Sequence, residues 1–363
     1  MKHVMILGTR GIPAQHGGFE TFAEQLSLYL VNLGWQVTVY CQVSDSSEIK
    51  EEFWRGVRLV KIPVSISGPA ATILYDMKAT LHSLKNDSVI LTLGYNTAVF
   101  GLFYRLFGKS NIINMDGIEW RRAKWGKVAK FWFYINEFIG CKIANHLVAD
   151  NPFIKQHLLR HAHSDKIAMI PYCADGPDVL SLADISVFGL KNGCYALLIA
   201  RPEPENSILE IVSSWSRSIR GIPLVVLGSY KDSSAYHKLV KDCSSAEVLF
   251  LGAIYDQDIV RALRINSLFY IHGHTVGGTN PSLVEAMSCA NAVIAHDNPY
   301  NRWVVSDGAL YFSNVDQCDA AISRLISDKS LVDELAQHTL TRFKQCFTKE
   351  IVLGQYAELL ASF

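Results

Sequence analysis

Short apolar runs of strand length alternate with segments of helical periodicity along almost all of the 363-residue chain, and no other feature limits its fold as strongly. Consecutive parallel strands need a crossover, usually a helix, so this alternation is typical of doubly wound parallel sheets. The first predicted strands are Val4–Gly8, one that begins at Val37, Val57–Pro63, Val89–Gly94, Asn111–Asp116, His146–Ala149 and Lys166–Pro171. The second series comprises Tyr195–Ala200, Leu224–Gly228, Val248–Gly252, Leu268–His272 and Ala292–Ala295. The sequence therefore predicts an α/β protein with two such sheets.

An irregular stretch from Cys173 to Gly193 separates the two series, and domains usually contain roughly 100–200 residues. We predict an N-terminal domain over residues 1–172 and a second domain over residues 193–345. A C-terminal helix over residues 346–363 could pack back on the first domain. Because open α/β sheets bind ligands at the carboxyl ends of their strands, the loops that follow the strands are expected to hold the site.

Composition excludes several classes of protein. The chain has 34 Lys and Arg against 34 Asp and Glu, whereas a general nucleic-acid binder usually has a clear basic excess. Its eight cysteines are scattered without a Cys-x-x-Cys pair, which fits reduced thiols and disfavours a cysteine zinc site. No apolar run approaches the ~20 residues of a membrane-spanning helix, and the first residues lack the cleavage-site pattern of a signal peptide. We therefore expect a cytoplasmic protein that binds no nucleic acid.

The loop after the first strand is rich in glycine, with Gly8, Gly11, Gly17 and Gly18. It does not match the Gly-x-Gly-x-x-Gly dinucleotide fingerprint, and the lysine of a P-loop is missing. Backbone without side chains would let a phosphate or a sugar come close to exposed N–H groups. The alternative is an ordinary turn in which the glycines supply positive φ angles.

The segment Gly277–Met287 combines a glycine pair with the start of a helix. Asn280 is a favourable N-cap and Pro281 a favourable first helical residue. Such a start would direct four free N–H groups and the positive end of the helix dipole at a ligand, which predicts a diphosphate site. Glu285 lies one turn further on the same face, where its carboxylate could accept hydrogen bonds from a ribose. The alternative for Glu285 is a solvated charge on the helix.

Arg201 directly follows the predicted strand Tyr195–Ala200. A guanidinium at the carboxyl end of a strand can bind a phosphate through two parallel hydrogen bonds. The alternative is an ion pair with the nearby Glu203 or Glu205.

Together these segments resemble the retaining GT-B glycosyltransferases. The spacing of the Gly17-Gly18 pair, Arg201 and Glu285 is similar to that of the family. A narrower resemblance is to the bacterial rhamnosyl- and galactosyltransferases of surface polysaccharide assembly, and it covers nearly the whole chain. It rests on Ile6–Pro13, Gly17–Thr21, Asp116–Trp120, Gly277–Met287 and His296–Pro299. It implies two Rossmann-like domains that face a central cleft, the first on the acceptor side and the second binding the nucleotide sugar.

The resemblance also implies roles for individual residues. Arg201 and the amides near Thr279–Ser282 would hold the donor diphosphate, and Tyr255 would flank the base. The full set implied in donor binding is Gly17, Gly18, Arg201, Tyr255, Gly278, Thr279, Asn280, Ser282, Leu283 and Glu285. The set implied on the acceptor side is Arg10, Glu119, Trp120 and Arg122. Asp116, Arg201 and Glu285 would be catalytic, and neither a metal ion nor another cofactor is implied.

The chain departs from the wider family at three positions. Gly277 stands where a second glutamate is common, Asn206 where a phosphate-binding lysine is common, and Asp116 where a histidine is common. Without the lysine, Arg201 and backbone N–H groups are left to neutralise the leaving group. Asp116 could orient the acceptor or act as a base.

Two short clusters of residues have side chains of the kind that bind metal ions in proteins. Asp256-Gln257-Asp258 is similar to the Asp-x-Asp of another glycosyltransferase fold, but we interpret it as two acids at the start of a helix. We interpret His157, His161 and His163 as a solvated helix end.

Residues 101–130 carry seven basic residues against two acidic ones, with tryptophans among them and an aromatic run at 131–134. Basic residues with aromatics favour the surface of an anionic membrane leaflet. The alternative is a buried amphipathic helix with a solvated basic face. We predict peripheral association with the inner face of the cytoplasmic membrane.

These observations predict a retaining transferase that moves L-rhamnose from dTDP-rhamnose to a lipid-linked or oligosaccharide acceptor in O-antigen or capsule assembly. The donor rests on the resemblance alone. One alternative is a transferase that uses a UDP-hexose such as UDP-galactose, and another is a sugar-nucleotide epimerase of the same architecture. A two-lobed sugar-binding protein and a dehydrogenase are disfavoured by the missing signal peptide and the missing dinucleotide fingerprint.

Overall fold

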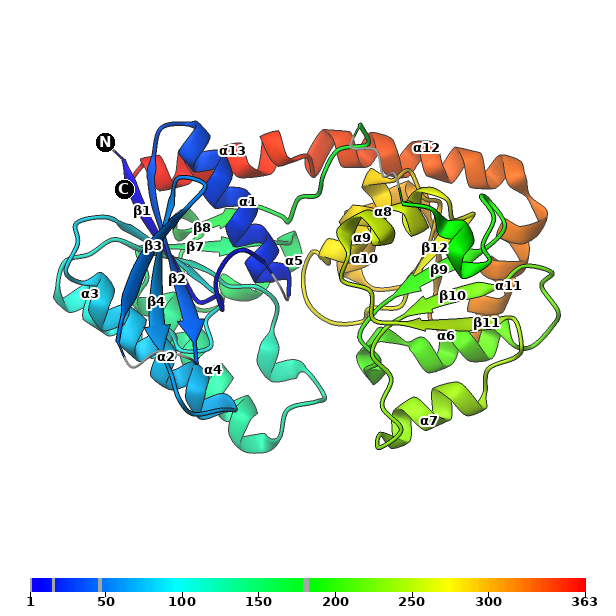
Figure 1. Ribbon diagram of the computed structural model, residues 1–363, viewed down its shortest axis with the longest axis horizontal. Helices are drawn as coiled ribbons and strands as arrows, with labels where there is room; N and C mark the ends of the chain where they lie inside the picture. Colours follow the sequence, from blue (N-terminus) through cyan, green and yellow to red (C-terminus); the bar gives the residue numbers. More distant parts are fainter. Residues whose placement is uncertain (1, 15–16, 45–47, 179–182) are drawn as a thin grey trace. The chain divides into compact units, whose positions relative to one another are not determined.

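A computed structural model describes residues 2–14, 17–44, 48–178 and 183–363. The chain forms two compact units (Figure 1). Unit 1 comprises Met1–Pro171 together with Glu350–Phe363, and unit 2 comprises Tyr172–Lys349.

Unit 1 is built on an eight-stranded sheet with the order β3-β4-β2-β1-β5-β6-β7-β8. Its strands are β1 (His3–Leu7), β2 (Gln36–Val43), β3 (Lys50–Trp54), β4 (Val57–Pro63), β5 (Val89–Leu93), β6 (Asn111–Asn114), β7 (His146–Ala149) and β8 (Ile167–Met169). All neighbouring strands pair in parallel except β3, which is antiparallel to β4. Sequence analysis missed β3 because it is an exposed edge strand with charged residues. Glu51 and Glu52 form ion pairs with Arg58 and Lys61 of β4.

The helices of unit 1 include the C-terminal one. They are α1 (Gly18–Asn32), α2 (Pro69–Ser83), α3 (Gly101–Leu106), α4 (Lys127–Ile143), α5 (Pro152–Leu158) and α13 (Lys349–Ala361). Tyr356 of α13 is buried, its hydroxyl accepts a hydrogen bond from Asn114 Nδ2 at 2.9 Å, and its ring lies 4.8 Å from that of Phe22. The end of the chain therefore forms part of the core of unit 1.

Unit 2 is built on a six-stranded, entirely parallel sheet with the order β11-β10-β9-β12-β13-β14. Its strands are β9 (Ala196–Ile199), β10 (Leu224–Leu227), β11 (Val248–Gly252), β12 (Phe269–His272), β13 (Val293–His296) and β14 (Ala309–Phe312). Its helices are α6 (Ile208–Trp215), α7 (Ala235–Asp242), α8 (Gln257–Ile265), α9 (Pro281–Ser288), α10 (Pro299–Val305), α11 (Val315–Ser327) and α12 (Lys329–Cys346). Alternate residues of the strands enter two separate hydrophobic cores, as expected for a sheet that is covered on both faces.

The predicted class of two α/β units with parallel sheets is confirmed, apart from the antiparallel edge strand. Among the parallel strands of each sheet the order reverses direction once, between β1 and β5 in unit 1 and between β9 and β12 in unit 2. Loops that leave neighbouring strands at such a switch point diverge to opposite faces, and ligands of open α/β sheets bind in the crevice between them. These two points are where a site is expected.

Among the helices in the described ranges, none has both the length and the apolar character that spanning a membrane requires.

Candidate functional site

At the switch point of unit 2, the loop after β9 and the loop after β12 are bound tightly to each other. His274 Nδ1 and Asn206 Oδ1 are 2.7 Å apart, and the backbone N–H of Thr275 donates to the carbonyl of Glu205 at 2.9 Å. Asn206 Nδ2 also donates to the carbonyl of Arg201 at 2.7 Å. Asn206 thus fixes the Arg201 loop to the glycine-rich loop that leads into α9.

Gly273 permits this close approach of the two loops. A Cβ atom at this position would lie 2.1 Å from the carbonyl oxygen of Asn206, a distance that no side chain tolerates. A third loop joins from β13, because Asn298 and Asn301 both donate to the carbonyl of His274, at 3.0 and 2.9 Å. The loops after three strands therefore form one hydrogen-bonded frame.

Arg201 is exposed at this edge of the sheet. Its guanidinium makes no ion pair with Glu203 or Glu205, and it has no hydrogen-bond partner in the described part of the chain. Asn206, at the position where the wider family often has lysine, is buried and fully used by the frame. Arg201 is consequently the side chain at this point that can offer a positive charge to a ligand.

Fewer N–H groups at the start of α9 can bind a ligand than the sequence indicated. Asn280 caps the helix, its Oδ1 accepting from the N–H of Ser282 at 3.0 Å, while its carbonyl accepts from Leu283 and Val284. Pro281 has no N–H, so the prediction of four free N–H groups is wrong: the cap residue has engaged the other three. The N–H groups of Gly278 and Asn280 itself have no partner within the described ranges, and these are the donors that a ligand could use.

The carboxylate of Glu285 is paired with an arginine and is only partly exposed to solvent. Its Oε2 is 2.5 Å from Nη2 of Arg264, at the end of α8, and 34% of its side chain is exposed against 5% for Arg264. Arg264 Nη2 also donates to Ser282 Oγ at 3.0 Å, and Ser282 Oγ is 2.9 Å from the hydroxyl of Tyr270. The arrangement holds one carboxylate oxygen of Glu285 and leaves the other side of the group facing solvent.

The remaining donor-side predictions have different outcomes. Leu283 is fully buried in a hydrophobic core, so its side chain cannot contact a ligand and this prediction is wrong. Thr279 is buried at the start of α9 and therefore lies within the frame. Tyr255 is 69% exposed and follows β11, which is two strands away from β9. Gly17 and Gly18 belong to unit 1.

His272 is a member of the site that the sequence did not reveal. It ends β12, is buried, and its Nε2 has no hydrogen-bond partner in the described ranges. Burial, together with the neighbouring His274 and His296, holds the pKa of His272 well below its usual range, so the ring is neutral. Arg264 also escaped prediction, because its role depends on a contact between two helices and not on a local pattern.

In unit 1, Asp116 follows β6 with a positive φ of 48°. Its N–H donates to Oδ1 of Asn114 at 2.9 Å, and Asn114 is in turn bound to Tyr356. Residues other than glycine are uncommon at positive φ, although aspartate adopts it more readily than most, and such positions cluster at functional sites. The fold therefore fixes the backbone of Asp116, which is half-buried at the carboxyl end of β6.

The predicted acceptor-side residues after Asp116 are engaged with their neighbours. Glu119 accepts from Arg122 Nη1 at 2.7 Å and from Trp125 Nε1 at 3.0 Å, so both its oxygens are used. Trp120 Nε1 donates to Glu137, whose other oxygen lies 2.8 Å from His157 Nε2. These contacts shape the loop, and they correct the interpretation of His157, which is buried and not solvated.

The loop after β1 shows the turn role of its glycines. Gly17 has φ 83° and precedes α1, and a Cβ there would lie 2.5 Å from Glu20 Oε2. Gly18 begins α1, and the exposed Arg10 donates its backbone N–H to Glu20 Oε1 at 3.0 Å. Residues 15 and 16 of this loop lie outside the described residues.

The Asp-x-Asp motif has the structural role that was expected. Asp256 caps α8, its Oδ1 accepting from the N–H groups of Asp258 and Ile259 at 2.9 and 3.2 Å. Across the ranges that the structure describes, no group of three or more His, Cys, Asp or Glu is placed to hold a metal ion.

Two family models match the chain. Residues 1–175 match a domain of unknown function, DUF1972, and residues 190–341 match the glycosyl transferases group 1. No curated protein matches the chain.

Solved structures of similar fold span essentially the full length. A sucrose-phosphate synthase from Thermosynechococcus elongatus superposes with a TM-score of 0.84 at 16% identity, over 100% of this chain and 99% of its own. HepE of Anabaena in complex with UDP gives 0.74 at 14% identity, with 100% of both chains covered. An α,α-trehalose-phosphate synthase (UDP-forming) from Burkholderia vietnamiensis gives 0.75 at 10% identity, again with 100% of both chains covered. At these identities the likeness carries information on the fold alone.

Proposed function

We propose that this chain, which is a glycosyltransferase with the GT-B fold, binds a nucleoside diphosphate sugar at the β9/β12 switch point of unit 2. The observation that carries the proposal is the frame that brings the free guanidinium of Arg201 and the open N–H groups of Gly278 and Asn280 to one edge of the sheet. Structural relatives named for UDP, or for a UDP-forming reaction, support a nucleoside diphosphate as the leaving group.

Breaking the bond between the sugar and the diphosphate produces an oxocarbenium-like sugar and a negative leaving group. Arg201 and the N–H groups at the start of α9 would stabilise that developing charge, and one preorganised donor of this kind is worth about 3–4 kcal/mol in other enzymes. Glu285, oriented by Arg264, would accept hydrogen bonds from the ribose. A phosphate oxygen would take the proton of the acceptor hydroxyl on the face that the diphosphate leaves, which gives retention.

The donor and the acceptor are proposed from the family resemblance. We assign L-rhamnose from dTDP-rhamnose as the transferred group and a lipid-linked glycan of surface polysaccharide assembly as the acceptor, oriented by Asp116. A UDP-hexose is the second candidate donor, because the relatives above are described with UDP or as UDP-forming. No metal ion is required in this scheme, since Arg201 and the backbone supply the positive charge.

Association with the inner face of the cytoplasmic membrane is part of the proposal. Val128, Phe131 and Phe138 of α4 are 85%, 67% and 41% exposed, and Lys124 and Lys127 are exposed beside them. An apolar helix face flanked by lysines is complementary to an anionic leaflet, and a lipid-linked acceptor would be presented there.

Thermal stabilisation of the purified protein by dTDP, UDP, GDP and NAD, each with magnesium and with chelator, tests the proposal. A ligand at ~100 times its dissociation constant adds ~2.7 kcal/mol of stability. We expect dTDP to stabilise the wild type with or without chelator and to have much less effect on Arg201→Ala. A response to UDP alone would replace the donor by a UDP-hexose, and a response to NAD alone would refute the proposal. Hydrolysis or epimerisation of the donor without any acceptor dependence would favour the epimerase.

A further inference from the structure

The loop that follows β10 joins the frame of unit 2 from a further side. In the sheet, β10 lies beside β9 on the side opposite to β12 (Figure 1). Gly228, directly after β10, permits a close approach, because a Cβ there would lie 2.6 Å from the carbonyl oxygen of Ala200 and 3.5 Å from Cδ of Pro202. The loops after β9 and β10 therefore meet at the two residues that flank Arg201.

His237, in the first turn of α7, connects these two loops through both nitrogens of its ring. Its Nδ1 accepts a hydrogen bond from the backbone N–H of Lys231 at 2.8 Å, and its Nε2 lies 2.9 Å from the carbonyl oxygen of Pro202. Since Nδ1 is an acceptor, the hydrogen of the neutral ring is on Nε2, which donates it to Pro202. The two contacts together select one tautomer of the imidazole.

The orientation of this ring is set by its surroundings. Ser234 caps α7, and its Oγ accepts a hydrogen bond from the backbone N–H of His237 at 3.4 Å. The ring of Tyr230 lies edge-on to the imidazole, with the ring centres 5.5 Å apart, and Tyr230 packs in turn on Phe250 of β11 at 4.9 Å. The imidazole therefore contacts the two loops from a half-buried position with a defined orientation.

The backbone of Arg201 is consequently held from both neighbouring strands. From the β12 side, Asn206 Nδ2 donates to the carbonyl of Arg201 at 2.7 Å. From the β10 side, His237 holds the carbonyl of the next residue, Pro202, whose own φ is fixed by its ring. The guanidinium of Arg201 has no partner in the described ranges, so its placement depends on how firmly this backbone is held.

We propose that His237 is a positioning residue of the donor site, which as the neutral Nε2–H tautomer holds the Arg201 loop so that the guanidinium meets the diphosphate in one orientation. This role rests on the proposed function, because His237 acts through Arg201. A donor that is already in place needs no reorganisation when the ligand binds or when charge develops on the leaving group. Loss of the contact with Pro202 should therefore weaken binding although Arg201 itself is still present.

Isothermal titration calorimetry of the full chain with UDP, dTDP and GDP tests the proposal through two variants that each keep one of the two hydrogen bonds. Glutamine reaches as far as Nε2 of histidine and can still donate to Pro202, whereas asparagine reaches only as far as Nδ1 and can still accept from Lys231. We expect His237→Asn to weaken binding of the preferred nucleotide about fivefold and His237→Gln to stay within about twofold of the wild type. His338→Asn, at an exposed histidine of α12, is the matched control and should bind as the wild type does.

A double-mutant cycle with Arg201→Ala separates positioning from a general loss of structure. If His237 acts through Arg201, His237→Asn should change the dissociation constant by less than about twofold once Arg201 is alanine. A fivefold loss in both backgrounds, or equal binding by His237→Gln and His237→Asn, would overturn the proposal. Nitrogen-15 NMR of the histidine rings should show the hydrogen of His237 on Nε2, and a hydrogen on Nδ1 would also overturn it.

The same titrations distinguish failure of this inference from failure of the proposed function. If the wild type binds none of the nucleotides, or if Arg201→Ala binds them as the wild type does, the donor site is refuted and the inference with it. Weaker binding by Arg201→Ala together with unchanged binding by His237→Asn would overturn the inference alone. If His237→Asn loses its unfolding transition, His237→Leu, which makes neither hydrogen bond but fills the space, takes its place with the same expected result.

Discussion

Arg264, at the end of α8, and Glu285, in the second turn of α9, form an ion pair, with Nη2 of the arginine 2.5 Å from Oε2 of the glutamate. The arginine is buried and the glutamate is one third exposed, so the pair connects the interior of unit 2 to its surface at the candidate site. Arg264 also donates a hydrogen bond to Ser282 Oγ, and this contact holds the start of α9 in place. Removing one partner of a buried pair is costly because the other charge is left uncompensated.

We expect Glu285→Gln to lower kcat/KM for the donor by about 10²-fold and the free energy of unfolding by about 2 kcal/mol, because Arg264 loses its counter-charge.

Arg264→Lys should raise KM for the donor more than it lowers kcat, since a lysine preserves the charge but not the planar guanidinium that orients the carboxylate of Glu285. Steady-state kinetics and urea unfolding measure both effects. Glu334→Gln, an exposed glutamate of α12, is the control, and equal effects there would remove any special role from Glu285.

Arg201→Ala should lower kcat/KM by about 10²-fold, which corresponds to the loss of one preorganised donor to the leaving group. Its stability should be close to that of the wild type, because the guanidinium has no partner within the described residues. Arg217→Ala removes another exposed arginine of unit 2, one that pairs with Asp316, and should leave kinetics unchanged. An Arg201→Ala enzyme with wild-type kcat would show that the leaving group is stabilised elsewhere.

Much of the fold could be predicted from the sequence because its strands are short segments rich in apolar residues that alternate with helical segments. Val57–Pro63, His146–Ala149 and Val248–Gly252 are strands with the predicted bounds. The strand β3 was missed because Lys50, Glu51 and Glu52 interrupt its apolar pattern. The other missed strand, β14, is apolar throughout, so its position at a sheet edge does not explain why it was missed.

The site was harder to predict, because its details depend on contacts between distant segments. The sequence indicated that Asn280 caps α9. The prediction of free N–H groups did not take into account that the side chain and the carbonyl of Asn280 accept hydrogen bonds from the next N–H groups of the helix. Leu283 is four residues before the buried Met287, so helical periodicity already placed it in the core. No local pattern distinguishes Arg264 from other helix-end arginines, and its partner is 21 positions away in the chain.

Gly273→Ala should disrupt the frame of unit 2. The added Cβ would meet the carbonyl oxygen of Asn206 at 2.1 Å, and the backbone would have to shift to relieve the clash. We expect a loss of about 2 kcal/mol or more in the free energy of unfolding, together with weaker nucleotide binding. Gly176→Ala is the matched control, because its Cβ would meet nothing within 4 Å. Equal stability of the two variants would contradict the role of Gly273 as a close-approach position.

Exposed apolar residues of α4 should determine binding to membranes. Val128→Ser combined with Phe131→Ser should lower co-sedimentation with anionic vesicles several-fold, because both side chains are exposed and would enter the interface. The binding should also fall with added salt, since the flanking lysines act through a screened attraction. Phe53→Ser removes an exposed phenylalanine of β3 and should have no effect. Vesicle binding that the α4 substitutions leave intact would assign membrane association to another surface.

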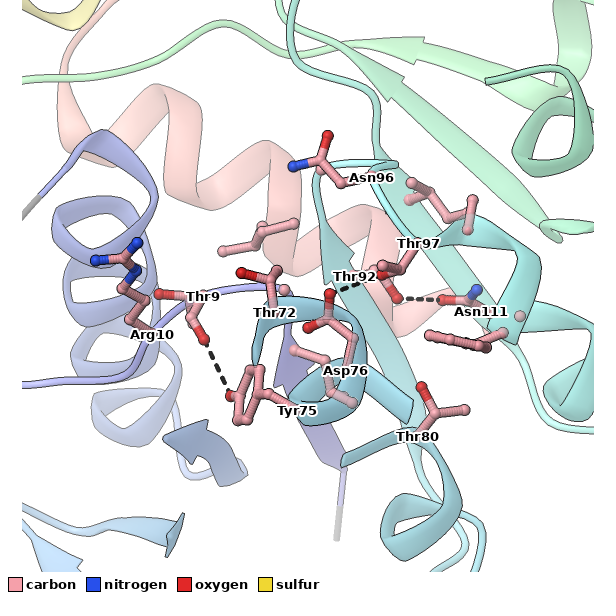
Figure 2. Close-up of a pocket in the computed structure, with 18 of the residues that line it drawn as sticks. Thr9, Arg10, Thr72, Tyr75, Asp76, Thr80, Thr92, Asn96, Thr97 and Asn111 are labelled. Carbon is pink, nitrogen blue, oxygen red and sulfur yellow. Dashed lines mark hydrogen bonds between the residues drawn. The ribbon is translucent and has the colours of Figure 1, made fainter. Parts of the chain in front are cut away.

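Asp76 should make the stability of unit 1 depend on pH. Burial raises its pKa to about 6, above the value of the unfolded chain, so the folded state favours the protonated form. The contribution of this group is therefore most favourable below about pH 4, declines as pH rises to about 6 and is constant above that, with a total difference of about 3 kcal/mol. Asp76 Oδ2 accepts a hydrogen bond from Thr97 Oγ1 at 2.8 Å (Figure 2), and Asp76→Asn keeps this acceptor and removes the titration.

Urea unfolding of the wild type and of Asp76→Asn, near pH 8 and near pH 4.5, measures this difference. The variant should be more stable than the wild type near pH 8 and similar to it near pH 4.5, and Asp165→Asn should show no such divergence because Asp165 is exposed. If Asp76→Asn is less stable than the wild type at the higher pH, the ionised carboxylate is stabilised by a contact in the folded state and its pKa is not raised.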